Sequence, residues 1–260
     1  AAAGLNHSIF LKDDGSLWAM GGGEYGQMGN GTTTGTNSTP VAVGGEGTSG
    51  VVAVAAGAMH SIFLKDDGSL WAMGGGEYGQ MGNGTTTNVN STPVAVAGEG
   101  SSGVVAVAGS AAQGDGDGIA TDGRHSLFLK SDGTLWGFGF NAYGELGDGT
   151  TTLRSSPVAV GGTGASSVVA MAGGGQHSLF LIDPQVITVA ATTQASEPGT
   201  NGLLTLTRTG DISAALTVNL AVTGTATAAN DYTTIAATAS FTASQATTTV
   251  TVSVIDDGDA

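Results

Sequence analysis

The sequence contains no cysteine, only six basic side chains and few aromatic residues. The lack of cysteine excludes disulfides and thiolate metal sites, although it does not fix the cellular compartment. The six basic side chains stand against 21 acidic ones, which gives a net charge of -15. Such a balance repels nucleic-acid phosphate and anionic lipid, so DNA, RNA and membrane surfaces are poor partners.

Long apolar runs and helical patterns are missing as well. Apolar stretches such as residues 51–56 and 104–108 are far shorter than the roughly 20 residues of a membrane-spanning helix. No apolar spacing of the i, i+3, i+4 type is present, and the 46 glycines are too many for stable helices. The sequence also has no initiator methionine and no basic-then-apolar leader, so we expect a mature or truncated piece. These patterns predict an all-β chain without a membrane-spanning helix.

A short segment recurs along the first 182 residues. Its copies read His-Ser-Ile/Leu-Phe-Leu and begin at His7, His60, His125 and His177. The first three copies are followed by Asp-Gly-Ser/Thr-Leu-Trp, which ends at Trp18, Trp71 and Trp136. A period of about 50 residues indicates one structural unit that is copied and stacked.

Each unit predicts four short antiparallel strands. In the second copy these are residues 51–55, 60–65, 69–73 and 93–96, the last being an outer strand where proline is tolerated. Asp66-Asp67-Gly68 is predicted as a tight turn between the second and third strands. Four strands in a unit of this length is the pattern of a β-propeller blade.

The recurring motifs resemble the regulator of chromosome condensation repeat family. The motifs are Gly-x-x-His-Ser-x-x-Leu-Lys-x-Asp-Gly-x-Leu-Trp, then Tyr-Gly-x-x-Gly-x-Gly-Thr-Thr-Thr, then Pro-Val-x-Val, over residues 1–182. The resemblance implies a partial propeller of about three and a half four-stranded blades, because the first unit lacks its leading strand and the fourth loses the Asp-Gly-x-Leu-Trp hairpin. We expect an open arc whose unpaired edges pair with further blades of the same gene or of another chain.

Composition changes after Pro184, which predicts a linker at residues 183–185 and a second domain at residues 186–260. Threonine and alanine dominate, and alternating strands are predicted at residues 186–189, 204–207, 216–222 and 249–255. With turn signals at residues 197–199 and 209–211, this pattern predicts an incomplete Ig-like β-sandwich.

The second domain resembles the Calx-beta domain family. The matching segments are residues 195–199, 204–211 and 224–227, then Asp231-Tyr232 and Val254-Ile255-Asp256-Asp257. Family members bind calcium through clustered carboxylates at one end of the sandwich, which implies calcium as a cofactor and Glu197, Asp231, Asp256 and Asp257 as its ligands. Family domains continue through two more strands and a further acidic loop, so we expect a C-terminally truncated sandwich, weak calcium binding and a gene that continues.

Recurrence separates packing groups from catalytic ones. The four histidines share one repeat position and the three tryptophans share another, so we interpret both as blade packing rather than as metal ligands or stacking platforms. The recurring Asp-Gly pairs are interpreted as hairpin turns rather than cation sites. The insert with Asp115, Asp117 and Asp122 occurs once. It lacks the spacing and closing glutamate of an EF-hand, which favours an ordinary loop and leaves cation binding open.

Three functions fit these patterns. We favour a non-enzymatic bacterial scaffold, extracellular or on the cell surface, that binds a protein or a surface glycan in cell adhesion and carries a calcium-binding module. The first alternative is a propeller glycosidase of the Asp-box type, although residues 131–136 have the wrong spacing and only Arg124, Arg154 and Arg208 could bind a substrate carboxylate. The second is a GTPase-regulating propeller, the founding activity of the first family, which would require a cytosolic address.

Overall fold

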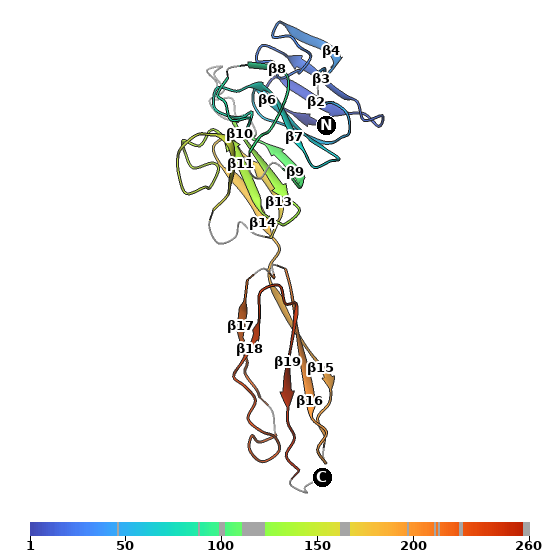
Figure 1. Cartoon of the computed structure of the whole chain (residues 1–260), viewed down its shortest axis with the longest axis vertical. Coiled ribbons are helices and arrows are strands. Elements are labelled where there is room, and N and C mark those ends of the chain that lie inside the picture. The colour runs from blue at the N-terminus through green and yellow to red at the C-terminus, as the bar shows by residue number, and fades with distance from the viewer. Residues whose placement is uncertain are drawn as a thin grey trace. The chain divides into compact units, whose positions relative to one another are not determined.

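The computed structural model describes residues 1–45, 47–87, 89–98, 102–110, 123–161, 167–196, 198–210, 212, 214–223 and 226–256. In this part of the chain every regular element is a β-strand (Figure 1). The all-β prediction is therefore confirmed. The chain forms two compact units, Ala1–Ile182 and Asp183–Ala260. The described residues contain no helix of the length and apolar character that a membrane crossing requires.

Unit 1 contains three four-stranded antiparallel sheets, in which the strands follow one another in chain order. The first sheet consists of β1 (Ala2–Ala3), β2 (His7–Leu11), β3 (Leu17–Gly22) and β4 (Thr36–Ala42). The second consists of β5 (Val51–Ala56), β6 (His60–Lys65), β7 (Leu70–Gly75) and β8 (Val89–Ala95). The third consists of β9 (Val104–Gly109), β10 (His125–Lys130), β11 (Leu135–Gly139) and β12 (Arg154–Ala159).

A two-stranded sheet follows, formed by β13 (Val168–Gly173) and β14 (Ser178–Ile182). We call this pair the half-blade. Within the described part of the chain this sheet has no third strand, which confirms that the fourth unit loses its Asp-Gly-x-Leu-Trp hairpin. The prediction that the first unit lacks a leading strand is wrong, because Ala2 and Ala3 form β1 and pair with Ile9 and Ser8. A strand of two alanines has no alternating pattern that a sequence could reveal.

The hairpin between the second and third strands has the same structure in each full sheet. The aspartate of the turn accepts hydrogen bonds from the residue two positions later. Asp14 Oδ1 accepts from the amide and hydroxyl of Ser16, at 2.9 and 2.5 Å. Asp132 Oδ1 accepts from the same two groups of Thr134, at 2.9 and 2.6 Å. The interpretation of the Asp-Gly pairs as turns is confirmed.

The apolar core of unit 1 lies between successive sheets. Two such cores lie between the three four-stranded sheets. In the first, residues of one sheet pack against Phe63 and Met73 of the next, and in the second they pack against Phe128 and Phe138. The first interface contains Ile9, Leu17, Ala19, Met28, Val43, Val51, Ala56, Phe63 and Met73. The second contains Ala55, Ile62, Leu64, Leu70, Ala72, Met81, Val96, Val104, Phe128 and Phe138. The core against the half-blade is smaller and contains Leu127, Leu129, Leu135 and Val168.

Unit 2 contains a three-stranded and a two-stranded antiparallel sheet. The first has the order β15 (Val186–Thr193), β16 (Gly202–Thr209) and β19 (Thr247–Val252), and the second pairs β17 (Leu216–Asn219) with β18 (Thr238–Phe241). Leu206, Ala239, Phe241 and Val250 form a buried core that joins the two sheets. Strand β18 is absent from the sequence predictions because Phe241 is its only large apolar residue. The Ig-like sandwich stays a prediction.

The side chain of Arg208 lies in the interior of unit 2, where only 1% of the residue is exposed. Its Nε donates to the carbonyl of Gln245 at 2.7 Å, and Nη1 donates to that of Ala214 at 2.9 Å. Its Nη2 donates to the carbonyls of Ile212 and Thr242 at 2.9 and 3.0 Å. One guanidinium therefore satisfies four carbonyl oxygens from two loops.

Replacing Arg208 by methionine should destabilise unit 2 by about 3 kcal/mol or more, because buried carbonyls would lose their donors. Hydrogen exchange of the amides in β16 and β18 measures this change. All three tryptophans lie in unit 1, so their fluorescence during unfolding is an internal control that should not change. Unchanged exchange in both strands would show that the guanidinium is dispensable.

Candidate functional site

Three of the four repeat histidines, His7, His60 and His125, each bond to the serine beside the next repeat histidine, whereas the fourth, His177, is exposed. Nε2 of the histidine lies 2.8, 2.8 and 3.1 Å from the serine Oγ in the pairs His7–Ser61, His60–Ser126 and His125–Ser178. We call these three pairs the histidine–serine ladder. It connects every sheet of unit 1 to the next one through a side-chain hydrogen bond.

The serines fix the direction of the ladder bonds. Ser61 Oγ donates to the carbonyl of Gln27 at 3.1 Å, and Ser178 Oγ donates to that of Glu145 at 2.7 Å. A hydroxyl has one proton, so these oxygens accept from the imidazole, which places the proton of His7 and His125 on Nε2. The serine immediately follows the histidine in every copy, and this recurring His-Ser pair is the sequence signal that could have revealed the ladder.

Burial keeps the ladder histidines neutral. Desolvation lowers the pKa of His7 and of His125 to about 4, and it lowers that of His60 to about 3. Nδ1 of each of the three rings is buried without a hydrogen-bond partner, which suits an unprotonated nitrogen. The interpretation of these histidines as packing groups is confirmed.

Glycine permits the close approach of the histidine ring. A Cβ on Gly57 would lie 2.0 Å from Cε1 of His60, so the ring packs directly on the glycine backbone. In the third sheet Ser110 takes this place, since its amide donates to the carbonyl of His125 and its Oγ accepts from the amide of His125, both at 3.1 Å. The insert follows Ser110 directly, and Asp115, Asp117 and Asp122 lie outside the described residues.

The stability of unit 1 should fall as the pH falls from about 6.5 towards 4. The folded-state pKa of each ladder histidine is lowered, so the unfolded chain takes up protons that the folded chain does not. At pH 5 the loss is about 2 kcal/mol per histidine.

His60→Gln keeps an N–H donor and removes one titration, so it should reduce the stability difference between pH 7 and pH 5 by about 2 kcal/mol. Urea unfolding followed by tryptophan fluorescence measures both quantities. The same pH dependence in wild type and variant would refute the role given to burial.

The three tryptophans are half-buried against their own hairpins. Each indole Nε1 donates to the hydroxyl two residues earlier, in the pairs Trp18–Ser16, Trp71–Ser69 and Trp136–Thr134. A lysine ammonium lies over each ring, at 3.8, 5.9 and 5.4 Å from the centroid for Lys12, Lys65 and Lys130. The interpretation of the tryptophans as packing residues is confirmed.

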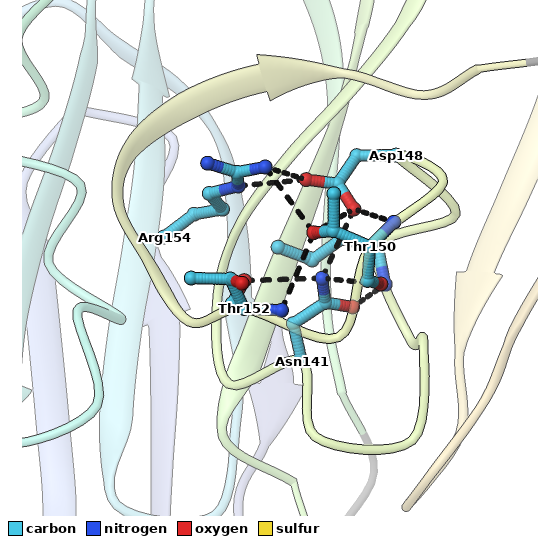
Figure 2. A network of polar contacts seen from close by, with 6 residues as sticks. Asn141, Asp148, Thr150, Thr152 and Arg154 are labelled. Carbon is cyan, nitrogen blue, oxygen red and sulfur yellow. Dashed lines mark hydrogen bonds and ion pairs between the residues drawn. The ribbon is translucent and has the colours of Figure 1, made fainter.

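A polar network closes the threonine-rich loop of the third sheet (Figure 2). Asn141 Nδ2 donates to Asp148 Oδ1 and to the carbonyls of Thr150 and Thr152, each at 3.1 Å. Arg154 donates to Asp148 Oδ2 through Nε and Nη2, at 2.7 and 2.6 Å. Burial raises the pKa of Asp148, but the bonds from Thr150, Arg154 and Asn141 outweigh it and hold that pKa below its ordinary value.

The corresponding loops of the first two sheets contain no such ion pair. Strand register aligns Arg154 with Asn37 and Asn90, because each pairs with the equivalent glycine near the end of the third strand of its sheet. Asn30 and Asn83 occupy the place of Asp148 and accept from the threonine amide two residues later, at 3.2 and 3.1 Å. The ion pair is therefore a variation on a loop that folds without it.

Asp148 and Arg154 should be energetically coupled. Arg154→Asn leaves a buried carboxylate unpaired and should cost about 3 kcal/mol, whereas Asp148→Asn should cost about 1 kcal/mol because the arginine can reach solvent. The double variant reproduces the asparagine pair of the first sheet, so the coupling energy should be about 1–2 kcal/mol. A double-mutant cycle by urea unfolding measures it, and additive effects would contradict the coupling.

The arginines that a glycosidase would need are engaged in separate structures. Arg154 belongs to the polar network, and Arg208 is buried in unit 2. The guanidinium of Arg124 lies 4.3 Å from the centroid of the Tyr78 ring. No cluster that could bind a substrate carboxylate is formed by these three residues.

Two of the four predicted calcium ligands lie on neighbouring backbone segments of unit 2. Tyr232 pairs with Val254, and the amide of Ile255 donates to the carbonyl of Asp231 at 3.0 Å. Asp231 and Asp256 are therefore close in register. Asp231 accepts a hydrogen bond from the amide of Thr227, and Asp256 is exposed.

Glu197 and Asp257 lie outside the described residues. An open cavity of about 590 Å³ includes Ser196, Asp231 and Val254 among its lining residues. Among the residues with described placement, no three His, Asp or Glu side chains form a group that could hold a metal ion.

The half-blade exposes a row of large apolar side chains. Leu179, Phe180 and Leu181 of β14 are 64%, 38% and 65% exposed. Their equivalents in β10 are Leu127, Phe128 and Leu129, which are 0%, 0% and 7% exposed. A cavity of about 330 Å³ lies on the half-blade and is lined by residues 170–172 and 179–181.

The repeats that form these sheets match a family model. The model of the regulator of chromosome condensation (RCC1) repeat matches residues 14–64, 67–112 and 132–181. The chain belongs to the RCC1 repeat family. Its resemblance to Calx-beta domains in residues 186–260 stays a prediction.

Curated RCC1-type relatives are much longer than this chain. The Ultraviolet-B receptor UVR8 of Arabidopsis thaliana is 30% identical over 182 residues, which are 70% of this chain and 38% of the receptor. The E3 ubiquitin-protein ligase HERC2 of Homo sapiens is 30% identical over 172 residues, which are 66% of this chain and 3% of the ligase. The chain therefore spans well under half the length of either relative.

Solved structures show that the RCC1 repeats adopt a propeller fold. The crystal structure of Prp20p from Saccharomyces cerevisiae matches with a TM-score of 0.58 and 20% identity, covering 68% of this chain and 42% of that chain. A chain in the crystal structure of Kap60 bound to yeast RCC1 (Prp20) matches with a TM-score of 0.55 and 17% identity, covering 98% and 54%. The prediction of propeller blades is confirmed.

Proposed function

We propose that this RCC1-repeat chain is a non-enzymatic interaction scaffold, extracellular or on the cell surface, that binds a protein or a surface glycan through unit 1. The observation that carries this proposal is how unit 1 uses its side chains. The recurring polar groups bond to one another or to backbone inside the sheets, whereas large apolar side chains are exposed on β14. An exposed apolar row of this kind is typical of a protein interaction site.

The relatives support an interaction role. The solved Prp20p structure is described with its binding properties to Gsp1p and histones, and the second structure contains Kap60 bound to yeast RCC1. Both descriptions concern binding to proteins. The net charge of -15 makes histone-like basic partners electrostatically compatible with this chain and nucleic acids incompatible.

The non-enzymatic assignment rests on the same side chains. Neutral, buried imidazoles in the ladder are unable to reach a substrate, and the three arginines serve packing or ion pairing. A panel of chromogenic glycosides and a nucleotide-exchange assay on a small GTPase test the two alternatives. We expect no turnover in either, and activity in one of them would replace the scaffold proposal with that alternative.

For unit 2 we propose a calcium-binding module of the Calx-beta type, with an Ig-like sandwich as its scaffold. The proximity in register of Asp231 and Asp256 supports it, as does the cavity that Asp231 shares with Ser196, the neighbour of Glu197. Calcium takes six to eight oxygen ligands, so the carboxylates at the four predicted positions suit its chemistry. The remaining ligands would be backbone carbonyls and water.

Millimolar calcium should raise the melting temperature of unit 2, because a ligand that binds only the folded state stabilises it. At tenfold the Kd the gain is about 1.4 kcal/mol. Differential scanning calorimetry with and without calcium measures the shift, and magnesium at the same concentration controls for ionic strength.

Asp256→Asn combined with Asp257→Asn should abolish the calcium shift. Asp66→Asn combined with Asp67→Asn removes the same charge from a hairpin turn of unit 1 and should preserve the shift. An equal shift in the two double variants would show that calcium acts through general screening rather than through the predicted site.

A further inference from the structure

We propose that β14 binds an extended segment of a partner protein, with the pattern Leu-Trp-small-Met/Phe-Gly, as the antiparallel third strand of the half-blade. The inference rests on the proposed interaction function and deepens it, since it names the surface and the chemistry of the partner. Three observations carry it: an open strand edge, an exposed apolar row, and three internal copies of the missing pairing.

The open edge is defined by the sheet order. In the full sheets the second strand lies between the first and the third, whereas among the described residues β14 pairs only with β13. Unpaired backbone N–H and C=O groups along such an edge are a template for strand addition. The exposed apolar row next to this edge provides the side-chain contacts.

The three full sheets show which strand fits. Leucine in the second strand pairs with leucine in the third, in the pairs Leu11–Leu17, Leu64–Leu70 and Leu129–Leu135. The phenylalanine before it pairs with tryptophan, in the pairs Phe10–Trp18, Phe63–Trp71 and Phe128–Trp136. By the same register, Leu181 would face a leucine and Phe180 a tryptophan of the added strand.

The third position of the added strand, opposite Leu179, accepts only a small residue. Ile9, Ile62 and Leu127 pair with Ala19, Ala72 and Gly137. A Cβ on Gly137 would already lie 3.1 Å from Cδ2 of Leu127 and 3.0 Å from Cδ2 of Leu146. Leu179 is the equivalent of Leu127, so the added strand needs alanine or glycine opposite it.

The fifth position of the added strand, beside His177, requires glycine. Gly21, Gly74 and Gly139 pair with the repeat histidines and have φ values of +110°, +117° and +110°. A Cβ at these positions would lie 2.3–2.5 Å from a backbone carbonyl oxygen of the preceding strand connection. The same approach beside His177 would select glycine in the partner.

A second copy of residues 1–260 does not offer this segment in unpaired form. The sequence has three tryptophans, and all three lie in β3, β7 and β11, which are paired on both sides in their own sheets. A second copy could donate such a strand only by opening one of its full sheets and exposing its buried core. A separate protein with an unpaired Leu-Trp segment incurs no such cost.

Fluorescence anisotropy with a labelled peptide tests this inference. The peptide Ser-Asp-Gly-Thr-Leu-Trp-Gly-Phe-Gly-Phe-Asn copies residues 131–141 and should bind the whole chain saturably. Leu179→Asp should weaken binding tenfold or more. Val105→Asp changes an apolar residue of β9 that is 53% exposed and should leave binding unchanged. Both side chains are exposed, so both variants should fold, which circular dichroism checks.

A second peptide tests the register. Valine in place of the glycine that copies Gly137 should weaken binding tenfold or more, because its side chain would meet Leu179. Hydrogen exchange of the β14 amides should slow when the first peptide is added and remain unchanged with the second.

Failure of the peptide to bind, or equal binding by Leu179→Asp and Val105→Asp, would overturn the inference. Self-association of the chain that the peptide reverses would identify a second copy as the occupant and would overturn the assignment to a different protein. The proposed function fails on different readouts, namely glycoside turnover or nucleotide exchange. If the peptide does not bind and no turnover is seen, only the inference about β14 is overturned, and the scaffold proposal stays in place.

Discussion

The hydrogen bond from a buried, neutral imidazole to the serine of the next sheet is the constraint on which unit 1 depends. It forms three times, in His7–Ser61, His60–Ser126 and His125–Ser178, and each time it connects two neighbouring sheets beside the apolar core that they share. Apolar packing does not define a direction, whereas a hydrogen bond between fixed atoms does. The ladder therefore sets how each sheet sits on the next, and the loops and edges follow from that stacking.

The ladder also supports the proposal that unit 1 acts as a scaffold and not as an enzyme. A ladder histidine is buried and its pKa lies far below 7, so it stays neutral at neutral pH, and its Nε2 proton is held in a hydrogen bond to a serine. The histidines and serines of the ladder lie inside unit 1 and recur from sheet to sheet. What differs between the copies is local: an ion pair in the third sheet, an insert after Ser110, and the half-blade with its exposed β14.

Much of the fold follows from sequence patterns with a clear physical basis. The apolar alternation and the Asp-Gly turns predict the second and third strands of every full sheet, because period-2 burial and turn chemistry are local properties. Strand β1 and strand β18 escaped this reasoning, since two alanines and a single phenylalanine give no alternation. The sequence shows that Arg208 is present, but it does not show that its guanidinium is buried, because two of the four carbonyls that it reaches, those of Gln245 and Thr242, lie far from it along the chain.

The sequence by itself determined that the chain is built of repeated sheet units, that its histidines and tryptophans recur at fixed positions of these units, and that its composition changes near residue 183. Local spacing suffices for these conclusions. Only the tertiary structure decided which serine each histidine meets, that Asp148 and Arg154 form a pair, and that Leu179 and Leu181 are exposed while Leu127 and Leu129 are buried. The β10 and β14 segments are nearly identical in sequence. Their burial differs because burial depends on the strands and sheets that lie beside them, which the segment does not encode.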